Sequence, residues 1–268
     1  MRTNLGTGLV TGFLLVAATA SADVAIPTFA TMDRLDGESK IIPSIGYTMF
    51  DSNGDESVAA QNLDLHAHFV APQGMGGYLQ ISAARVSLGD ETESGLNNLE
   101  LGGLYQLHSS VPVVFRAGLS IDTSDAEDGA FFGSYWRTTD FMANFPDTTS
   151  VRVSASPMIR SGIGFFRADV GVDVPIDAPD DNDVTDPMVR LNVGGGVETG
   201  GIAVMGELAT IALTGDADER FLHTVAVTGR YMNAQVRPSL SLVVPLDEVI
   251  REFMTLSIQV GVEVPLPI

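Results

Sequence analysis

The sequence predicts a closed, up-and-down antiparallel β-barrel of about 12 strands that crosses a membrane with its strands. Three observations lead to this fold class. Apolar and polar residues alternate along many runs of about ten residues, short turns and longer acidic segments join these runs in turn, and the chain begins with a secretory pattern. Alternation with a period of two places the two residue types on opposite faces of a strand. Short turns at one end and longer loops at the other are typical of barrels that cross a bilayer.

The first 22 residues predict a signal peptide. Arg2 supplies the positive start, residues 9–18 form the apolar core, and Ala20-Ser21-Ala22 gives the small-x-small pattern before Asp23. We therefore expect cleavage between Ala22 and Asp23. The apolar core is too short to span a bilayer comfortably, and no later segment approaches twenty apolar residues without a charge.

Residues 23–39 show no sustained period and contain Pro27 and Gly37. We interpret them as a short periplasmic leader, with a partial plug that folds back into the barrel as the alternative. The sequence leaves both open. The barrel itself is expected over residues 40–268.

The last run shows the alternation most clearly. From Met254 to Val264 the even-numbered residues are apolar, and the odd-numbered residues are polar or glycine. A similar pattern recurs about every twenty residues. The weakest run is 78–87, because Arg85 shares the parity of its apolar residues. The expected strands are 40–50, 58–71, 78–87, 97–107, 112–122, 151–160, 163–174, 188–198, 202–213, 221–232, 235–246 and 253–264.

The connections between these strands are of two kinds. Acidic segments are expected at 51–57, 88–96, 123–150, 175–187, 214–220 and 247–252, and short turns at 72–77, 108–111, 161–162, 199–201 and 233–234. Both termini then fall at the end with the short turns. In hydrocarbon every backbone N–H and C=O must pair within the protein, so the sheet has to close on itself.

Aromatic residues mark the two ends of the expected strands and suggest interfacial girdles. More of them lie at the turn end than at the loop end. The turn end has Phe69, Tyr78, Tyr105, Phe115, Phe165, Phe166 and Tyr231, and the loop end has Phe50, Phe221 and Phe253.

The charge is strongly unbalanced. The chain has 34 Asp and Glu against 14 Lys and Arg, a net charge of −20, yet its mean hydropathy is +0.21. Charged and apolar residues must therefore be separated in space. A chain this acidic lacks the basic face that nucleic acid binding requires. The absence of cysteine excludes disulfides and thiolate chemistry.

The chain from Lys40 to Ile268 resembles a Gram-negative outer-membrane β-barrel of the porin-like kind. Its end is similar to the C-terminal assembly signal of that class, with Val260, Val262, Val264 and Leu266 at alternating positions, although Ile268 replaces the usual terminal aromatic. The resemblance implies an outer-membrane location, surroundings of membrane lipid and lipopolysaccharide, and recognition of the last strand by the assembly machinery. It implies no particular site residue.

Charged residues of inward parity near the turn end are the first candidate site. They form either a cationic constriction that selects anionic solutes or a network of arginines and carboxylates that braces or fills the lumen. Both interpretations stay open. The residues are Arg116, Arg160, Arg167, Arg230, Arg237, Glu198 and Glu263, with Asp64, Arg152, Asp169, Arg190 and Glu207 expected nearer mid-height.

Asp64, His66 and His68 share one strand face and suggest a zinc site, since a His-x-His pair can bind zinc with a third ligand. No third ligand is obvious in the sequence, so we favour an ordinary strand face that lines a polar lumen. We count these three residues among the candidates for ion or solute selectivity. His108 and Ser110 have the spacing of a hydrolase pair. They fall in an expected turn at the wrong end, so we do not expect catalysis or a cofactor.

Two acidic loops have the oxygen density of weak divalent-cation sites. They are residues 51–55 and the segment containing Asp177, Asp180, Asp181, Asp183 and Asp186. The longest loop, 123–150, carries aromatic residues that would need burial. Within it Phe131, Phe132, Tyr135 and Trp136 fit one helical face. We expect this loop to fold inward and narrow the pore, or to rest as a cap on neighbouring loops.

The function expected from these observations is passive passage of small hydrophilic solutes or ions through an outer-membrane channel. The alternative is a closed structural or surface-interaction barrel whose acidic loops face outward.

Overall fold

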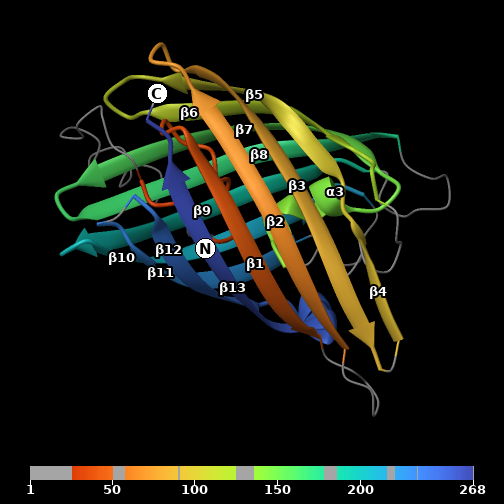
Figure 1. The fold of residues 1–268 in the computed structure, drawn as a ribbon. Helices are drawn as coiled ribbons and strands as arrows, with labels where there is room; N and C mark the ends of the chain where they lie inside the picture. The colour runs from red at the N-terminus through yellow and green to blue at the C-terminus, as the bar shows by residue number, and fades with distance from the viewer. Residues whose placement is uncertain are drawn as a thin grey trace, which may run out of the picture.

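The strands form one closed antiparallel ring. The computed structural model describes residues 26–50, 58–89, 91–124, 136–177, 186–215, 221–233 and 235–267. In these parts of the chain each strand pairs with the next along the sequence, except that β3 pairs with both β4 and β5, and the first strand pairs with the last and so closes the ring (Figure 1). The strands are β1 (Lys40–Phe50), β2 (Val58–Val70), β3 (Met75–Leu88), β4 (Glu91–Leu96), β5 (Leu99–Leu107), β6 (Val113–Ile121), β7 (Thr149–Ser161), β8 (Gly164–Asp177), β9 (Met188–Thr199), β10 (Ile202–Leu213), β11 (Phe221–Tyr231), β12 (Arg237–Pro245) and β13 (Met254–Pro265).

The 13 strands form a 12-stranded barrel, because β4 and β5 together occupy one strand position in the ring. β3 pairs with β4 along one half of its length and with β5 along the other half. Asn97 and Asn98 lie between the two. The predicted fold class, a closed antiparallel barrel of about 12 strands, is therefore confirmed.

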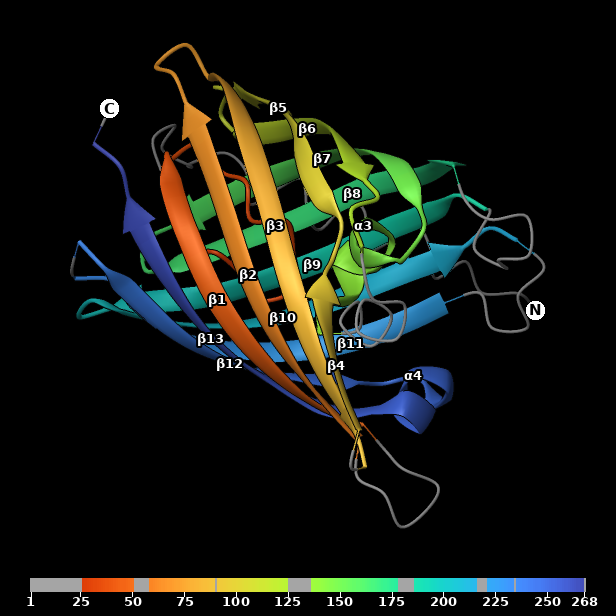
Figure 2. The ribbon, with the colours of Figure 1, turned by 45° about the vertical axis from the view of Figure 1, so that its right-hand side comes forward.

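Two of the connections predicted from the sequence were wrong. The segment 88–96 was expected to be an acidic loop, but Glu91–Leu96 is strand β4 and pairs with β3 from Leu88 to Ala83. The exposed side chains of β4 are typical of a hairpin that extends beyond the ring, where a strand needs no apolar face (Figure 2). The segment 247–252 was expected to be a loop, but it holds most of the helix α4 (Glu248–Phe253).

Two further short helical elements lie between β6 and β7: the 3-10 helix η2 (Thr138–Asp140) and the α-helix α3 (Phe141–Asn144). None of the helices among the described residues is both long and apolar enough to cross a bilayer.

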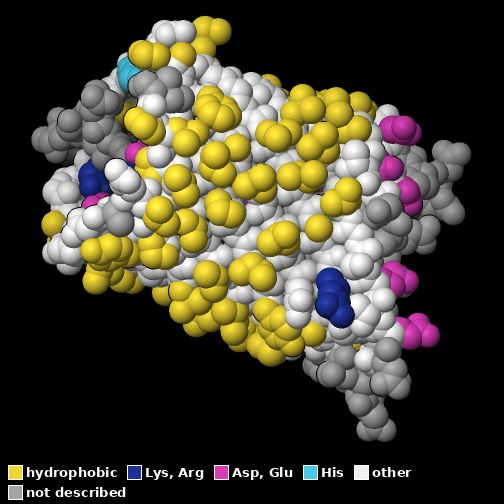
Figure 3. Space-filling model, in the orientation of Figure 1, with side chains coloured by type: hydrophobic (Ala, Val, Ile, Leu, Met, Phe, Trp, Pro, Cys, Tyr) yellow, Lys and Arg dark blue, Asp and Glu magenta, His cyan; other side chains and the backbone are white. Residues whose placement is uncertain are grey.

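The barrel is apolar outside and polar inside. Along β2 the outward Leu63 is 62% exposed and Leu65 43%, whereas the inward Asp64, His66 and His68 are buried. Apolar side chains cover the visible wall, and acidic side chains gather at one end (Figure 3). This distribution suits a wall in contact with hydrocarbon, so the protein is a membrane-spanning barrel of the outer-membrane type.

The expected aromatic girdle is only partly correct. Phe69 and Tyr105 point outward and are about half exposed, as a girdle at the turn end requires. Tyr78, Phe165 and Phe50 instead point into the barrel and are buried. Their strand positions were right, but a residue at a strand end serves a girdle only when its parity is outward.

Two segments that are not part of the wall occupy the lumen. Residues 26–39, which we call the plug, fill the turn end, where β1 begins. Residues 136–148, which we call the inner loop, enter from the opposite, loop end and contain η2 and α3. The sequence left open whether the leader extends away from the barrel or folds back, and the structure places these residues inside.

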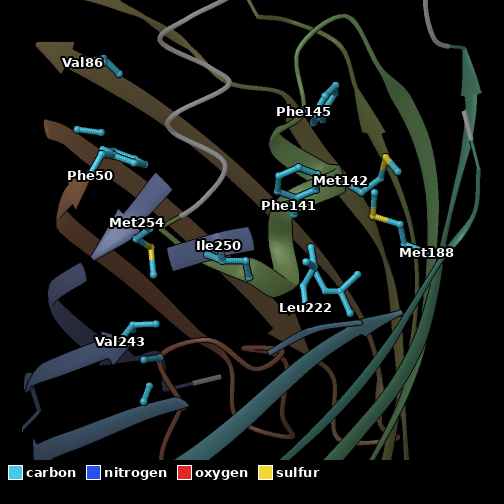
Figure 4. Packing of buried hydrophobic residues seen from close by; sticks show 14 residues of the cluster. Phe50, Val86, Phe141, Met142, Phe145, Met188, Leu222, Val243, Ile250 and Met254 are labelled. Carbon is cyan, nitrogen blue, oxygen red and sulfur yellow. The ribbon is translucent and has the colours of Figure 1, made fainter. Parts of the chain in front are cut away.

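Each segment packs in an apolar cluster at its own end of the lumen. At the turn end Ile26, Phe29, Met32 and Leu35 of the plug lie against inward residues of the wall. At the loop end Phe141, Met142 and Phe145 of the inner loop pack with residues of the wall and of α4 (Figure 4). The wall residues and α4 residue labelled there are Phe50, Val86, Met188, Leu222, Val243, Ile250 and Met254. Polar and charged side chains fill the zone between the clusters.

Candidate functional site: the filled lumen

A carboxylate on the barrel wall binds the backbone of the plug. Glu207, on β10, accepts hydrogen bonds from three consecutive backbone N–H groups, those of Ala30, Thr31 and Met32, at 2.8, 2.8 and 3.1 Å. The hydroxyl of Thr31 donates a fourth at 2.8 Å. No described cation forms a salt bridge with Glu207, so the backbone of the plug supplies the donors that a buried carboxylate needs.

The adjacent plug residues Asp33 and Arg34 contact different sides of the ring. The Asp33 carboxylate accepts hydrogen bonds from Arg116 on β6 at 2.9 Å and from Ser154 on β7 at 3.0 Å. The Arg34 guanidinium forms an ion pair with Asp64 on β2 and lies 3.3 Å from the hydroxyl of Ser44 on β1. Both plug side chains are buried.

The electrostatics of Asp33 depend on its arginine neighbours. Burial alone would raise the pKa of the Asp33 carboxyl, but nearby guanidinium groups, Arg116 foremost, hold that pKa well below its usual range. The backbone N–H of Asp33 also donates to Asp169 on β8 at 2.9 Å. The plug is thus charged where it meets the wall.

A second group of charges fixes the two ends of the plug. Lys40, at the start of β1, forms an ion pair with Asp36 and lies 3.6 Å from Glu263 on β13. Glu263 accepts a hydrogen bond from the N–H of Thr28 at 3.0 Å, while Arg230 on β11 donates to the carbonyl of Thr28 at 3.0 Å. Despite burial, the pKa of Asp36 is lowered, chiefly by Lys40.

The inner loop is held by the junction between β4 and β5. The side-chain amide of Asn98 donates to the carbonyls of Phe145 and Thr148 at 2.7 and 2.9 Å. Ser120 on β6 donates to the carbonyl of Ala143 at 2.8 Å. Asn98 lies at the break between β4 and β5, so this break in the strand supplies the side chain that anchors the inner loop.

The plug and the inner loop touch each other at the centre of the lumen. Arg137 donates to the carbonyl of Met32 at 2.6 Å, and the Thr139 hydroxyl donates to the carbonyl of Thr31. Arg137 also pairs with Asp140 at 2.8 Å. Burial lowers the pKa of Arg137 to about 10, which leaves the side chain protonated at neutral pH.

Glycines in the wall leave space for the large side chains of both segments. A Cβ added at Gly194 on β9 would lie 2.6 Å from the ring of Phe29 and 2.8 Å from the sulfur of Met32. A Cβ added at Gly46 on β1 would lie 2.5 Å from the ring of Trp136. The wall is therefore shaped to fit the plug and the inner loop.

The structure brings the predicted charged residues together as ion pairs. All the arginines predicted near the turn end face the lumen side of the ring, and each lies close to a carboxylate. The pairs are Arg116 with Asp33 and Glu100, Arg160 with Glu198, Arg167 with Asp169, Arg230 with Glu263, and Arg237 with Glu38 and Glu263. Ten of the chain's 14 basic residues take part in such pairs within the barrel.

Two residues of the Asp64-x-His66-x-His68 pattern, Asp64 and His68, contact the plug. Asp64 binds Arg34 and accepts a hydrogen bond from Gln80 at 3.0 Å. The rings of His66 and His68 lie 3.2 Å apart at Nε2 and Nδ1, and His68 reaches Asp36 at 3.3 Å. Asp64 and His68 therefore have charged plug residues, Arg34 and Asp36, as their neighbours.

Trp136 is buried against the plug at the mouth of the inner loop. Its indole lies under the guanidinium of Arg34, 5.8 Å from the ring centroid, and its carbonyl accepts a hydrogen bond from Gln259 on β13 at 2.7 Å. The other aromatic candidates, Phe131, Phe132 and Tyr135, lie outside the described residues, as do residues 51–57 and 178–185 of the acidic loops.

The sequence reasoning missed the plug residues. A signal was present, since Ile26, Phe29, Met32 and Leu35 recur at every third position and all are buried in one cluster. Charged residues follow closely in the same segment. An apolar stripe beside alternating charges, in a segment too short to fold alone, could have indicated docking into a polar cavity. Glu100, Arg137, Asp140 and Asp173 were missed as well.

No family model matches the sequence, and no curated protein matches it either. Among solved structures, an outer membrane channel from Pseudomonas putida F1 has a TM-score of 0.62 at 14% identity, covering 91% of this chain and 100% of that one. The NanC porin has a TM-score of 0.54 at 10% identity, covering 84% of this chain and 100% of that one. These similarities establish the fold of an outer-membrane β-barrel.

Proposed function

We propose that the protein is an outer-membrane channel for passive passage of small hydrophilic solutes or ions, and that the plug and the inner loop close it at rest. The observation that carries this proposal is the polar wall of the lumen. On β2, Asn62, Asp64, His66 and His68 all point inward. Hydrated solutes can pass through a lumen lined in this way once the plug and the inner loop move.

The contacts that hold the plug support a reversible closure. They are hydrogen bonds and ion pairs to several strands, and the chain has no cysteine that could fix the plug covalently. The plug is continuous with the start of β1, so it can leave the lumen through the turn end without disturbing the ring.

Conductance in planar bilayers tests this function. The full-length chain should give small or rare current steps, and a variant that lacks residues 26–38 should give larger, discrete steps. A heat-dependent shift on an SDS gel checks that the variant still forms a barrel. A variant that lacks both the plug and residues 126–147, that folds and that carries no current would contradict the channel.

A closed structural or surface-interaction barrel is the second candidate, because the described lumen is densely filled and its charges are paired. In that case the acidic loops would do the binding, and removal of the plug would only destabilise the barrel. We further propose that the last strand is recognised by the assembly machinery, that the acidic loops bind divalent cations weakly, and that the protein is not an enzyme.

A further inference from the structure

The filled lumen contains a binding site that one pair of plug residues occupies. Four arginines line the wall from β6 to β9: Arg116, Arg152, Arg167 and Arg190. Three wall carboxylates face them, namely Glu100, Asp169 and Asp173. These wall residues alone therefore carry one more positive than negative charge. Asp33 of the plug pairs with Arg116, and Asp140 of the inner loop, which also pairs with Arg137, lies 3.2 Å from Arg152.

The site has more hydrogen-bond donors than Asp33 uses. Among the described residues, Nη2 of Arg167 and Nε of Arg190 are buried without an acceptor. Asp33 takes one donor from Arg116 and one from Ser154. A buried guanidinium N–H without an acceptor is costly, so another oxygen acceptor placed here would be stabilised.

A complementary site for a cation lies on the other side of the ring. Asp64 on β2 is buried, and Arg34 is the cation in contact with it. Gln80 donates to the second oxygen of Asp64 at 3.0 Å, and the ring of Trp136 lies over the guanidinium of Arg34. A carboxylate beside an aromatic ring favours a flat or quaternary cationic nitrogen.

We propose that the lumen binds a zwitterionic solute, one that carries a carboxylate and a cationic nitrogen, and that Asp33 and Arg34 of the plug imitate this solute at rest. The carboxylate of the solute would take the place of Asp33 at Arg116, Arg167 and Arg190. Its cationic nitrogen would take the place of Arg34 at Asp64. The inference rests on the proposed channel, since a solute reaches these groups only through the lumen.

The proposal gives the plug a role in selection. A solute that offers one charge alone fills half of the site and leaves the other half unpaired in a buried setting, which is unfavourable. A solute with both charges restores every ion pair that the departing plug breaks. Zwitterions therefore compete with the plug more effectively than simple anions or cations do.

The test uses the full-length chain with Asp33→Ala and Arg34→Ala, which empties both halves of the site. The probe is the blocked dipeptide N-acetyl-Asp-Arg-amide, which carries the same carboxylate and guanidinium at the spacing of Asp33 and Arg34, and the readout is the thermal unfolding midpoint in detergent micelles. Millimolar probe should raise the midpoint of the double variant by about 2 °C or more and leave the wild type nearly unchanged. Butyrate, guanidinium chloride and sodium chloride at equal concentration should have smaller effects.

Two further variants make the result specific. Adding Arg116→Gln and Asp64→Asn to the double variant should abolish the shift, because these changes remove the wall partners. If the double variant does not fold, the single variant Asp33→Ala is tested with butyrate and the single variant Arg34→Ala with guanidinium, each of which should rescue only its own half. Equal effects of the probe and of sodium chloride, or of the probe on all variants, would overturn the proposal.

The channel and the site can fail separately. A plug-deleted barrel that conducts ions, but whose current is unaffected by N-acetyl-Asp-Arg-amide, would refute the zwitterion site and leave the channel intact. Partial block of that current by the probe, and not by butyrate, is the expected result.

Discussion

Glu207 is a single wall residue that binds the backbone of the plug at several positions. Its carboxylate is the acceptor for three backbone N–H groups and one hydroxyl of the plug. Hydrogen bonds to a charged acceptor are stronger than neutral ones, and a buried N–H that loses its acceptor costs about 1–3 kcal/mol. The backbone N–H groups of three consecutive plug residues therefore depend on one side chain for their acceptor.

Glu207→Ala should release the plug. The change leaves three buried N–H groups without acceptors, so the seated plug should lose about 3 kcal/mol or more, and Glu207→Gln should lose less. Trypsin measures the release, because Arg34 is buried in the seated plug and becomes cleavable outside it. Glu198→Ala is the control, since Glu198 pairs with Arg160 near the turn end. Equal cleavage of the two variants would contradict the role of Glu207.

Because of Asp33, the contribution of the bound plug to the free energy of unfolding depends on pH. The pKa of Asp33 is lower in the folded protein than the value of 3.8 in the unfolded chain. Its contribution to the free energy of unfolding is therefore fully present above pH 3.8 and is lost as the pH falls through the folded pKa. The charges that lower this pKa are those of Arg116, Arg167 and Arg190, Arg116 first.

The difference in unfolding free energy between the wild type and Asp33→Asn measures this contribution. It should be about 3–5 kcal/mol and constant from pH 8 down to pH 5, and it should shrink only below pH 3.8. Denaturant titrations in lipid vesicles at each pH provide the values. Glu91→Gln, on the exposed hairpin strand β4, should show no such difference. A difference that already disappears at pH 6 would mean that another group holds the plug.

At the scale of elements, the plug and the inner loop are separate devices that meet at the centre of the lumen. Each has its own apolar cluster and its own wall glycine. The contacts between them go through Arg137 and Thr139 to the plug backbone and through Trp136 to the guanidinium of Arg34. Displacement of one segment should therefore weaken the other without removing it.

Alanine at the two glycines should displace the two segments selectively. Gly194→Ala forces Phe29 and Met32 away, and Gly46→Ala forces Trp136 away, each at a cost of about 1–3 kcal/mol for overpacking. Trp136 is the single tryptophan of the chain, so its emission reports on the inner loop and on the plug residue Arg34 that lies against its ring. Gly46→Ala should shift this emission to the red, whereas Gly194→Ala should chiefly increase trypsin cleavage after Arg34.

Gly229→Ala is the matched control for both, because a Cβ at Gly229 on β11 meets nothing within 4 Å. It should change neither the emission nor the cleavage. A red shift in all three variants would mean that the glycines act through general strand stability instead of through the space they leave.

The sequence predicted the wall well and its contents poorly, for one physical reason. Alternation is a local property, so β13 was expected at 253–264 and is found at Met254–Pro265. β4 was missed because a hairpin beyond the membrane needs no apolar face. The contacts of Asp33 join residues up to 136 positions apart, because its backbone N–H donates to Asp169. No local pattern encodes such contacts, although the apolar stripe of the plug hinted at them.

At the scale of the whole molecule, the barrel reverses the usual distribution of polarity. Apolar side chains face outward to the hydrocarbon, and the ion pairs lie inside. Buried ion pairs are weak sources of stability, because desolvation offsets much of their attraction. Closure of the ring is more important, since it leaves no strand edge unpaired within the hydrocarbon.

The seam between β1 and β13 is the point where closure can be tested. Thr48 and Ser257 face each other across it, and their hydroxyls lie 3.1 Å apart inside the barrel. Because the chain has no cysteine, Thr48→Cys with Ser257→Cys introduces a single pair of thiols. In a closed ring the pair should oxidise within one molecule and join residues 209 positions apart. The oxidised chain should then migrate faster than the reduced chain on a denaturing gel.

The matched control is Thr228→Cys with Ser241→Cys, on the neighbouring strands β11 and β12, whose hydroxyls lie 2.7 Å apart. This pair spans only 13 positions, so it should oxidise whether or not the ring closes and should hardly alter migration. In the chain-entropy model the seam disulfide should also stabilise the barrel more, since the constraint grows with the length of the closed loop. Oxidation of the control pair together with failure of the seam pair, or with links only between molecules, would show that β1 and β13 do not meet.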